Sequence, residues 1–135
     1  MPSVTLSLDW LGDMKFRNSE GNPAIELDSS SSAGVTTPPQ ALAYAVAACM
    51  AMDVIHVIRK GRHDLRGLTI GIEGERAEEH PRRFVSMSLA FHLVGEVPDH
   101  VVERAIALSR DKYCSVWNTI RTDVPLTTTF DIQKP

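Results

Sequence analysis

The sequence has few cysteines and aromatic residues and no cluster of like charge. Of its 135 residues, two are cysteines and 6% are aromatic, while 23% are charged and leave a formal net charge of −3. The lysines and arginines are scattered along the chain, whereas nucleic-acid-binding proteins gather them on one face. We therefore expect no nucleic-acid partner.

The sequence also lacks a long uncharged apolar run. The longest one, residues 41–52, is shorter than the roughly 20 residues that span a bilayer. The N-terminal segment has neither the basic region nor the apolar region of a signal peptide. These features predict a cytoplasmic protein without a membrane partner. A hydrophobic content of 43% is enough for a core, and the length predicts a single domain, residues 1–135.

Two further motifs are absent: a glycine loop that cradles phosphate and a Gly-x-Ser-x-Gly elbow. This absence turns attention to the two cysteines, Cys49 and Cys114. A permanent disulfide is not expected in a reducing cytosol. The pair is therefore either two inert buried thiols, which composition alone favours, or a reversible dithiol.

The first third of the chain predicts strands. Residues 4–10 alternate between apolar and polar, which is typical of a strand with one buried face. Residues 14–17 and 24–27 read as a hairpin around residues 20–22, and the serine-rich stretch 29–34 reads as a loop.

A long helix is predicted next. Thr37 is the expected N-cap, Pro38 takes the first helical position, and Gln40 completes a Thr-x-x-Gln capping box. Residues 41–58 are apolar on nearly every face, which indicates a buried central helix. Gly61 is expected at the C′ position, giving a helix of about 23 residues.

The second half predicts strands around another helix, in the overall order β-β-β-α-β-β-α-β. Because hairpins rather than βαβ units are expected, the chain is assigned to the α+β class. The predicted elements are strands at 68–72 and 85–93 with a charged turn at 77–83 between them, a helix from Pro98 to about Tyr113, a short helical turn at 115–120 and a closing strand at 126–132.

Each cysteine has a reactive and an inert interpretation. Cys49 lies several turns inside the long helix, where the helix dipole has faded, so a thiolate there needs a nearby cation or hydrogen-bond donors. Without them it is a packing residue. Cys114 follows the second helix. If a short helix begins there, its free amides favour a thiolate; otherwise Cys114 is buried beside Tyr113 and Trp117.

Three polar residues share one face of the long helix. Cys49, Asp53 and His56 fall at i, i+4 and i+7, a spacing that suits a metal or a Cys–His pair. Three residues on one helix are short of a complete site unless further ligands converge. The simpler interpretation is a polar helix edge, and no metal or cofactor is expected.

Three segments, Pro38 to Arg62, Glu75 to Pro81 and Leu108 to Val116, together resemble the OsmC/Ohr family. The resemblance covers nearly the whole chain in the right order. Its most specific part is the placement of the cysteines, one inside the central apolar helix and one just after the second helix.

The resemblance implies an OsmC-like fold, with antiparallel sheets around long buried central helices, in an intertwined homodimer. It also implies a thiol peroxidase acting on hydroperoxides in oxidative-stress defence. By the same resemblance Cys49 is the peroxidatic residue and Cys114 the resolving residue. A dithiol reductant then restores both thiols by exchange.

The chain departs from the family pattern at the start of the long helix. Pro39 stands where the peroxidase branches carry a glutamate that holds an arginine over the reactive sulfur. Gln40 and Arg17 are the candidates for these two supporting roles. The departure keeps open a second interpretation, a diverged member that binds a small apolar or electrophilic molecule without peroxidase turnover.

Overall fold

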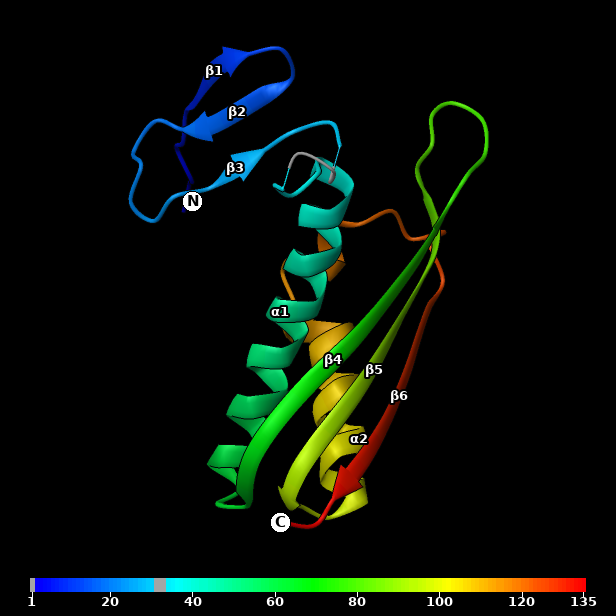
Figure 1. The fold of residues 1–135 in the computed structure, drawn as a ribbon. Coiled ribbons are helices and arrows are strands. Elements are labelled where there is room, and N and C mark those ends of the chain that lie inside the picture. The colour runs from blue at the N-terminus through cyan, green and yellow to red at the C-terminus, as the bar shows by residue number, and fades with distance from the viewer. Residues whose placement is uncertain (1, 31–33) are drawn as a thin grey trace. The chain divides into compact units, whose positions relative to one another are not determined.

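The computed structural model describes residues 2–30 and 34–135. The helices and strands follow the predicted order, β-β-β-α-β-β-α-β. The chain divides into two compact units, Met1–Leu42 and Ala43–Pro135, which we describe separately (Figure 1).

The first unit is a small antiparallel sheet. β1 (Leu8–Gly12) pairs with β2 (Lys15–Asn18), which pairs with β3 (Glu26–Leu27) and so confirms the predicted hairpin. The predicted buried face of the first strand is wrong, because all five residues of β1 are exposed. A sheet whose third strand has two residues provides no covering layer of its own. The predicted loop at 29–34 falls partly on residues 31–33, outside the described residues.

Helix α1 (Pro38–Lys60) begins where the capping box predicts. The Thr37 backbone N–H donates to Gln40 Oε1 at 3.0 Å, and the Gln40 backbone N–H donates to Thr37 Oγ1 at 3.3 Å. These reciprocal bonds satisfy two amides at the start of the helix. The predicted length of 23 residues is also confirmed.

The end of α1 differs from the prediction by one residue. Arg62, with φ of 61°, takes the left-handed conformation expected of Gly61. The His63 N–H donates to the Ile58 carbonyl at 3.3 Å and closes the last turn. Gly61 is needed for space instead, since a Cβ there would lie 2.9 Å from the His63 ring.

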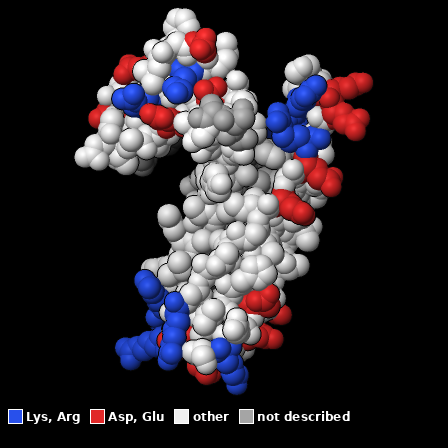
Figure 2. Space-filling model, in the orientation of Figure 1, with Lys and Arg blue, Asp and Glu red and all other residues white. Residues whose placement is uncertain are grey.

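Burial of α1 is confined to one stripe. Its buried residues are Val46, Ala47, Met50, Val54 and Ile58, whereas Tyr44 and Met52 are 60% and 67% exposed. The expectation of a helix buried on all faces is therefore wrong for the chain alone. Figure 2 shows that the visible face of the second unit carries its charged side chains toward its ends and few between them.

Helix α1 is also more extensively apolar than the uncharged run at 41–52 indicates. By length and composition alone it could cross a membrane, because an 18-residue window within it reaches a mean hydropathy of 1.9. The core helix of a soluble protein meets the same criterion, and 33% of this window is buried within the chain.

The second unit is built on a mixed sheet. β4 (Asp64–Arg76) pairs antiparallel with β5 (Phe84–Glu96), and β6 (Leu126–Gln133) pairs parallel with β5. The expectation of hairpins throughout is thus wrong here, because the connection from β5 to β6 passes through α2 (Asp99–Leu108) as a crossover. The charged turn at 77–83 is confirmed between β4 and β5.

One hydrophobic cluster joins the helices to the sheet. Alternate residues of β5 point into it, and Met87, Leu89, Phe91 and Leu93 are at most 2% exposed. The buried stripe of α1, Val102 and Ala105 of α2, and Cys114 complete it. This packing fixes α1 against the segment after α2, which is where both cysteines lie.

Candidate functional site

The two cysteines, far apart in sequence, come together in the second unit. Cys49 is half-buried in the middle of α1, and Cys114 is fully buried just after the second helix. Both thiols are free, and their sulfurs and a carboxylate oxygen of Asp53 all lie within 4.8 Å of one another. The site is therefore a paired-thiol centre with one adjacent acidic group.

A turn of π-helix, η2 (Ser109–Tyr113), positions Cys114. The Cys114 N–H donates to the Ser109 carbonyl at 2.8 Å, the wide five-residue spacing of this helix type. Ser109 is fully buried, and its hydroxyl donates to Asp53 Oδ2 at 2.7 Å. Single π turns inside α-helices occur often at functional sites. Here the turn ties the segment before Cys114 to α1.

The chain after Cys114 is held in a tight turn. It leads into a 3₁₀ turn, η3 (Trp117–Thr119), which confirms the predicted short helix. The Trp117 N–H donates to Cys114 Sγ at 3.2 Å. The Asn118 side-chain amide donates to the carbonyls of Arg110 and Cys114 at 3.0 and 2.8 Å. These bonds fix the backbone amides that follow Cys114.

The Cys49 thiol is activated by this turn. Burial is the largest single effect and by itself raises the pKa of Cys49. Hydrogen bonds from the Val116 backbone N–H and from the Cys114 and Ser115 side chains outweigh it and hold the pKa below its usual value. The negative charge of Asp53 acts in the opposite direction. The donors that a mid-helix thiolate requires are thus present.

The Cys114 thiol has the opposite character. Burial raises the pKa of Cys114 to about 11, helped by the neighbouring Cys49 and opposed by the Trp117 and Val116 amides. The Trp117 and Val116 amides do favour a Cys114 thiolate, as expected of the short helix, but burial exceeds their effect and raises the pKa. At neutral pH Cys49 is the more nucleophilic sulfur of the pair.

The two predicted supporting residues have local partners in the first unit. The Gln40 side chain accepts a hydrogen bond from the Thr37 amide, as part of the helix cap. Arg17 Nε lies 3.5 Å from the Glu26 carboxylate across the β2–β3 pair. In these contacts Gln40 caps the start of α1, and Arg17 forms an ion pair across the small sheet.

The metal hypothesis is changed by the structure. Among the described residues, the convergent group is Cys49, Asp53 and Cys114, so Cys114 takes the place expected of His56. Two thiolates and a carboxylate could serve as three ligands of a soft divalent ion with an open fourth position. The high pKa of Cys114 opposes such binding, because the thiol must lose its proton first.

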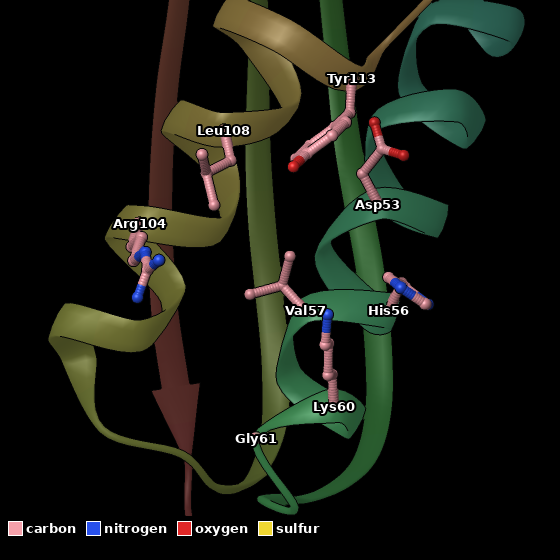
Figure 3. A pocket seen from close by; sticks show the side chains of 8 residues that line it. All are labelled: Asp53, His56, Val57, Lys60, Gly61, Arg104, Leu108 and Tyr113. Carbon is pink, nitrogen blue, oxygen red and sulfur yellow. The ribbon is translucent and has the colours of Figure 1, made fainter.

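A pocket of about 610 Å³ is lined by Asp53, the acidic neighbour of the thiol pair, and by neither cysteine. Figure 3 shows Asp53 and Tyr113 toward one end and Lys60 and Gly61 toward the other. Val57 and Leu108 form apolar walls, and the remaining lining residues are His56 and Arg104. Pockets of this size accept small organic molecules.

Fold and site together define an α+β protein with a paired-thiol centre. The family model for OsmC-like protein matches residues 31–129, and the chain belongs to this family. It is 31% identical over 125 residues to protein YhfA of Escherichia coli strain K12, covering 91% of this chain and 93% of the relative.

Several solved structures share the fold. A hypothetical protein from Aquifex aeolicus VF5 is 23% identical with a TM-score of 0.91, covering 100% of this chain and 99% of the other. An organic hydroperoxide resistance protein OsmC from Legionella pneumophila is 19% identical with a TM-score of 0.70, covering 97% and 99%.

Proposed function

We propose that this protein is a thiol-dependent hydroperoxide reductase of the cytoplasm that acts in oxidative-stress defence. One observation supports it most: the Cys49 and Cys114 sulfurs lie within 4.8 Å of each other, and their pKa values are shifted in opposite directions. Peroxide reduction by two cysteines needs one thiolate that attacks the peroxide and one thiol that stays protonated until it resolves the sulfenic acid. Cys49 is suited to the first role and Cys114 to the second.

In the first step the Cys49 thiolate attacks one oxygen of the hydroperoxide. The O–O bond breaks, the hydroxyl group of the hydroperoxide is transferred to Cys49 as a sulfenic acid, and the other oxygen takes a proton from solvent and leaves as an alcohol. The sulfur is oxidised by two electrons and the peroxide is reduced by two. The Val116 and Ser115 donors lower the pKa of Cys49 and so raise its thiolate fraction before the attack.

In the second step Cys114 attacks the oxidised sulfur of Cys49. A disulfide forms and the sulfenic oxygen leaves as water. A dithiol reductant then attacks the disulfide, leaves as its own cyclic disulfide, and returns both thiols. This protein needs no further cofactor for the cycle.

An organic hydroperoxide is the proposed substrate class. The pocket at Asp53 offers the apolar side chains Val57 and Leu108 to an alkyl group, beside several polar and charged lining residues. The Legionella pneumophila protein with the same fold is described as an organic hydroperoxide resistance protein, which supports the same choice.

The direct test is oxidation of the reduced protein by one equivalent of cumene hydroperoxide. We expect the peroxide to be consumed and mass spectrometry under non-reducing conditions to show one Cys49–Cys114 disulfide. Protein with both thiols alkylated beforehand is the control and should consume none. If both thiols remain free after prolonged excess peroxide, the enzyme hypothesis is wrong.

That negative result would favour a second candidate, a protein that binds a small apolar or electrophilic molecule without turnover. The specific observation in its favour is at the start of α1, where Pro39 replaces the expected glutamate and Gln40 is engaged in the helix cap. A binding protein would shield Cys49 from alkylation by an apolar ligand while consuming no peroxide.

We further propose that the protein is a homodimer. The exposed apolar side chains support this, above all Val4 and Leu6 at 83% and 77% exposure in the first unit and Met52 on α1. Surfaces of this kind are normally covered by a partner. Light scattering is expected to give twice the chain mass of 14.9 kDa. A mass equal to one chain at micromolar concentration would contradict the dimer.

A further inference from the structure

We propose that Asp53 accepts the proton of the Cys114 thiol in the step that forms the Cys49–Cys114 disulfide. This rests on the function proposed above and concerns its second step. This role in proton transfer differs from the two earlier interpretations of Asp53, a polar residue at the helix edge and a metal ligand.

The geometry places the carboxylate beside both reacting atoms. One Asp53 carboxylate oxygen lies within 4.8 Å of both the Cys49 and Cys114 sulfurs, and the proposed transfer requires this oxygen to approach the thiol to hydrogen-bond distance. The Ser109 hydroxyl, fully buried, donates to Asp53 Oδ2 at 2.7 Å and orients the carboxylate. Ser109 opens the same π turn that delivers Cys114, so base and thiol are held by one element.

The chemistry of the second step requires a base. Because burial raises the pKa of Cys114 to about 11, the thiolate fraction at pH 7 is only about one in ten thousand. Attack on the sulfenic acid needs the thiolate or a thiol that loses its proton during the attack. A carboxylate next to the thiol supplies the acceptor.

Asp53 is unfavourable for the first step. Its negative charge raises the pKa of Cys49 and so works against the Val116, Cys114 and Ser115 hydrogen bonds. A neutral residue at this position would give a more acidic Cys49. The carboxylate is therefore explained by the resolving step and not by the peroxide step.

The proposed transfer balances. Asp53 takes the proton from the Cys114 sulfur as this sulfur attacks Cys49 and forms the S–S bond. The S–O bond of the sulfenic acid breaks, and the departing hydroxide takes the proton back from Asp53 as water. The carboxylate ends the step ionised, and the two sulfurs together have lost two electrons to the peroxide oxygen.

The test uses a disulfide reagent in place of peroxide, so that it does not depend on peroxidase activity. The Cys49 thiolate first attacks dithiobis(nitrobenzoate), forms a mixed disulfide with half of the reagent and releases the other half as thionitrobenzoate. Cys114 then displaces the second from Cys49 and forms the intramolecular disulfide. The full-length protein is followed by stopped-flow absorbance with a chelator present, and mass spectrometry identifies the disulfide.

We expect Asp53→Asn to slow the second release about 10- to 100-fold and to leave the first release as fast as in the parent protein or faster. Asp111→Asn, in the same π turn but exposed, is the matched control and should change neither phase. An unchanged second phase in Asp53→Asn overturns the proposal, and so does equal slowing of both phases.

A second variant decides the matter if Asp53→Asn does not fold. Asp53→Glu keeps the charge on α1 and displaces the carboxylate by one methylene, so the second phase should slow while the first does not. If both phases of Asp53→Glu run at the rates of the parent protein, the proposal is overturned. The cumene hydroperoxide experiment is read separately, so a failure of the peroxidase function is distinguishable from a failure of the Asp53 role.

Discussion

Cys49→Ser is expected to abolish hydroperoxide consumption, with a loss of at least about 1000-fold. A serine hydroxyl stays protonated at neutral pH and is a far weaker nucleophile than a thiolate. Cys114→Ser is expected to react once at nearly the parent rate and then stop. Its hydroxyl can replace the thiol as a hydrogen-bond donor to Cys49, but it cannot form a disulfide. The two variants therefore separate attack from resolution.

The measurement is a single turnover with cumene hydroperoxide followed by turnover with a dithiol reductant. In Cys114→Ser, a sulfenic acid on Cys49 should be trapped by dimedone, and excess peroxide should convert it to the sulfinic acid. The parent protein should resist this over-oxidation. Steady consumption by Cys49→Ser, or trapping of the sulfenic acid on Cys114, would reverse the assigned roles.

The sequence carries most of the fold because its signals are local. The reciprocal bonds of Thr37 and Gln40 depend on four adjacent residues, and the helix start followed from them. The parallel pairing of β6 with β5 is not a local property, since it depends on how the α2 crossover returns the chain. The exposed face of β1 was missed for a related reason: alternation predicts a face but not what covers it.

The candidate site was only half visible in the sequence. Both cysteines were identified from their placement in the resemblance, but their activation was sought in Gln40 and Arg17, which have local partners. The structure instead supplies donors from Ser115 and Val116, directly after Cys114. Every residue except proline carries a backbone N–H, so residue identity alone does not predict which N–H donates to the Cys49 sulfur.

Asp53 illustrates the same limit. Its i, i+4 spacing from Cys49 marked it as a neighbour, and the metal hypothesis followed from that face of the helix. The partners that change its meaning, Ser109 and Cys114, come from the other end of the chain. Only tertiary packing brings a buried hydroxyl onto the carboxylate and a protonated thiol beside it.

The most specific test of the activation proposed for Cys49 is Val116→Pro. Val116 has φ of −69°, within the range that proline adopts, and the substitution removes the backbone N–H that bonds to Cys49. Because this bond lowers the pKa of Cys49, its loss should move the thiolate titration to higher pH. A shift of one pH unit corresponds to about a tenfold lower thiolate fraction near neutral pH.

Val116→Ala is the matched control, because it truncates the side chain and keeps the N–H. The rate of Cys49 alkylation by iodoacetamide, measured against pH, should have its midpoint at a higher pH in Val116→Pro than in Val116→Ala or the parent. Thermal unfolding of both variants checks that the turn after Cys114 is retained. Coincident pH profiles would show that the Val116 amide does not set the reactivity of Cys49.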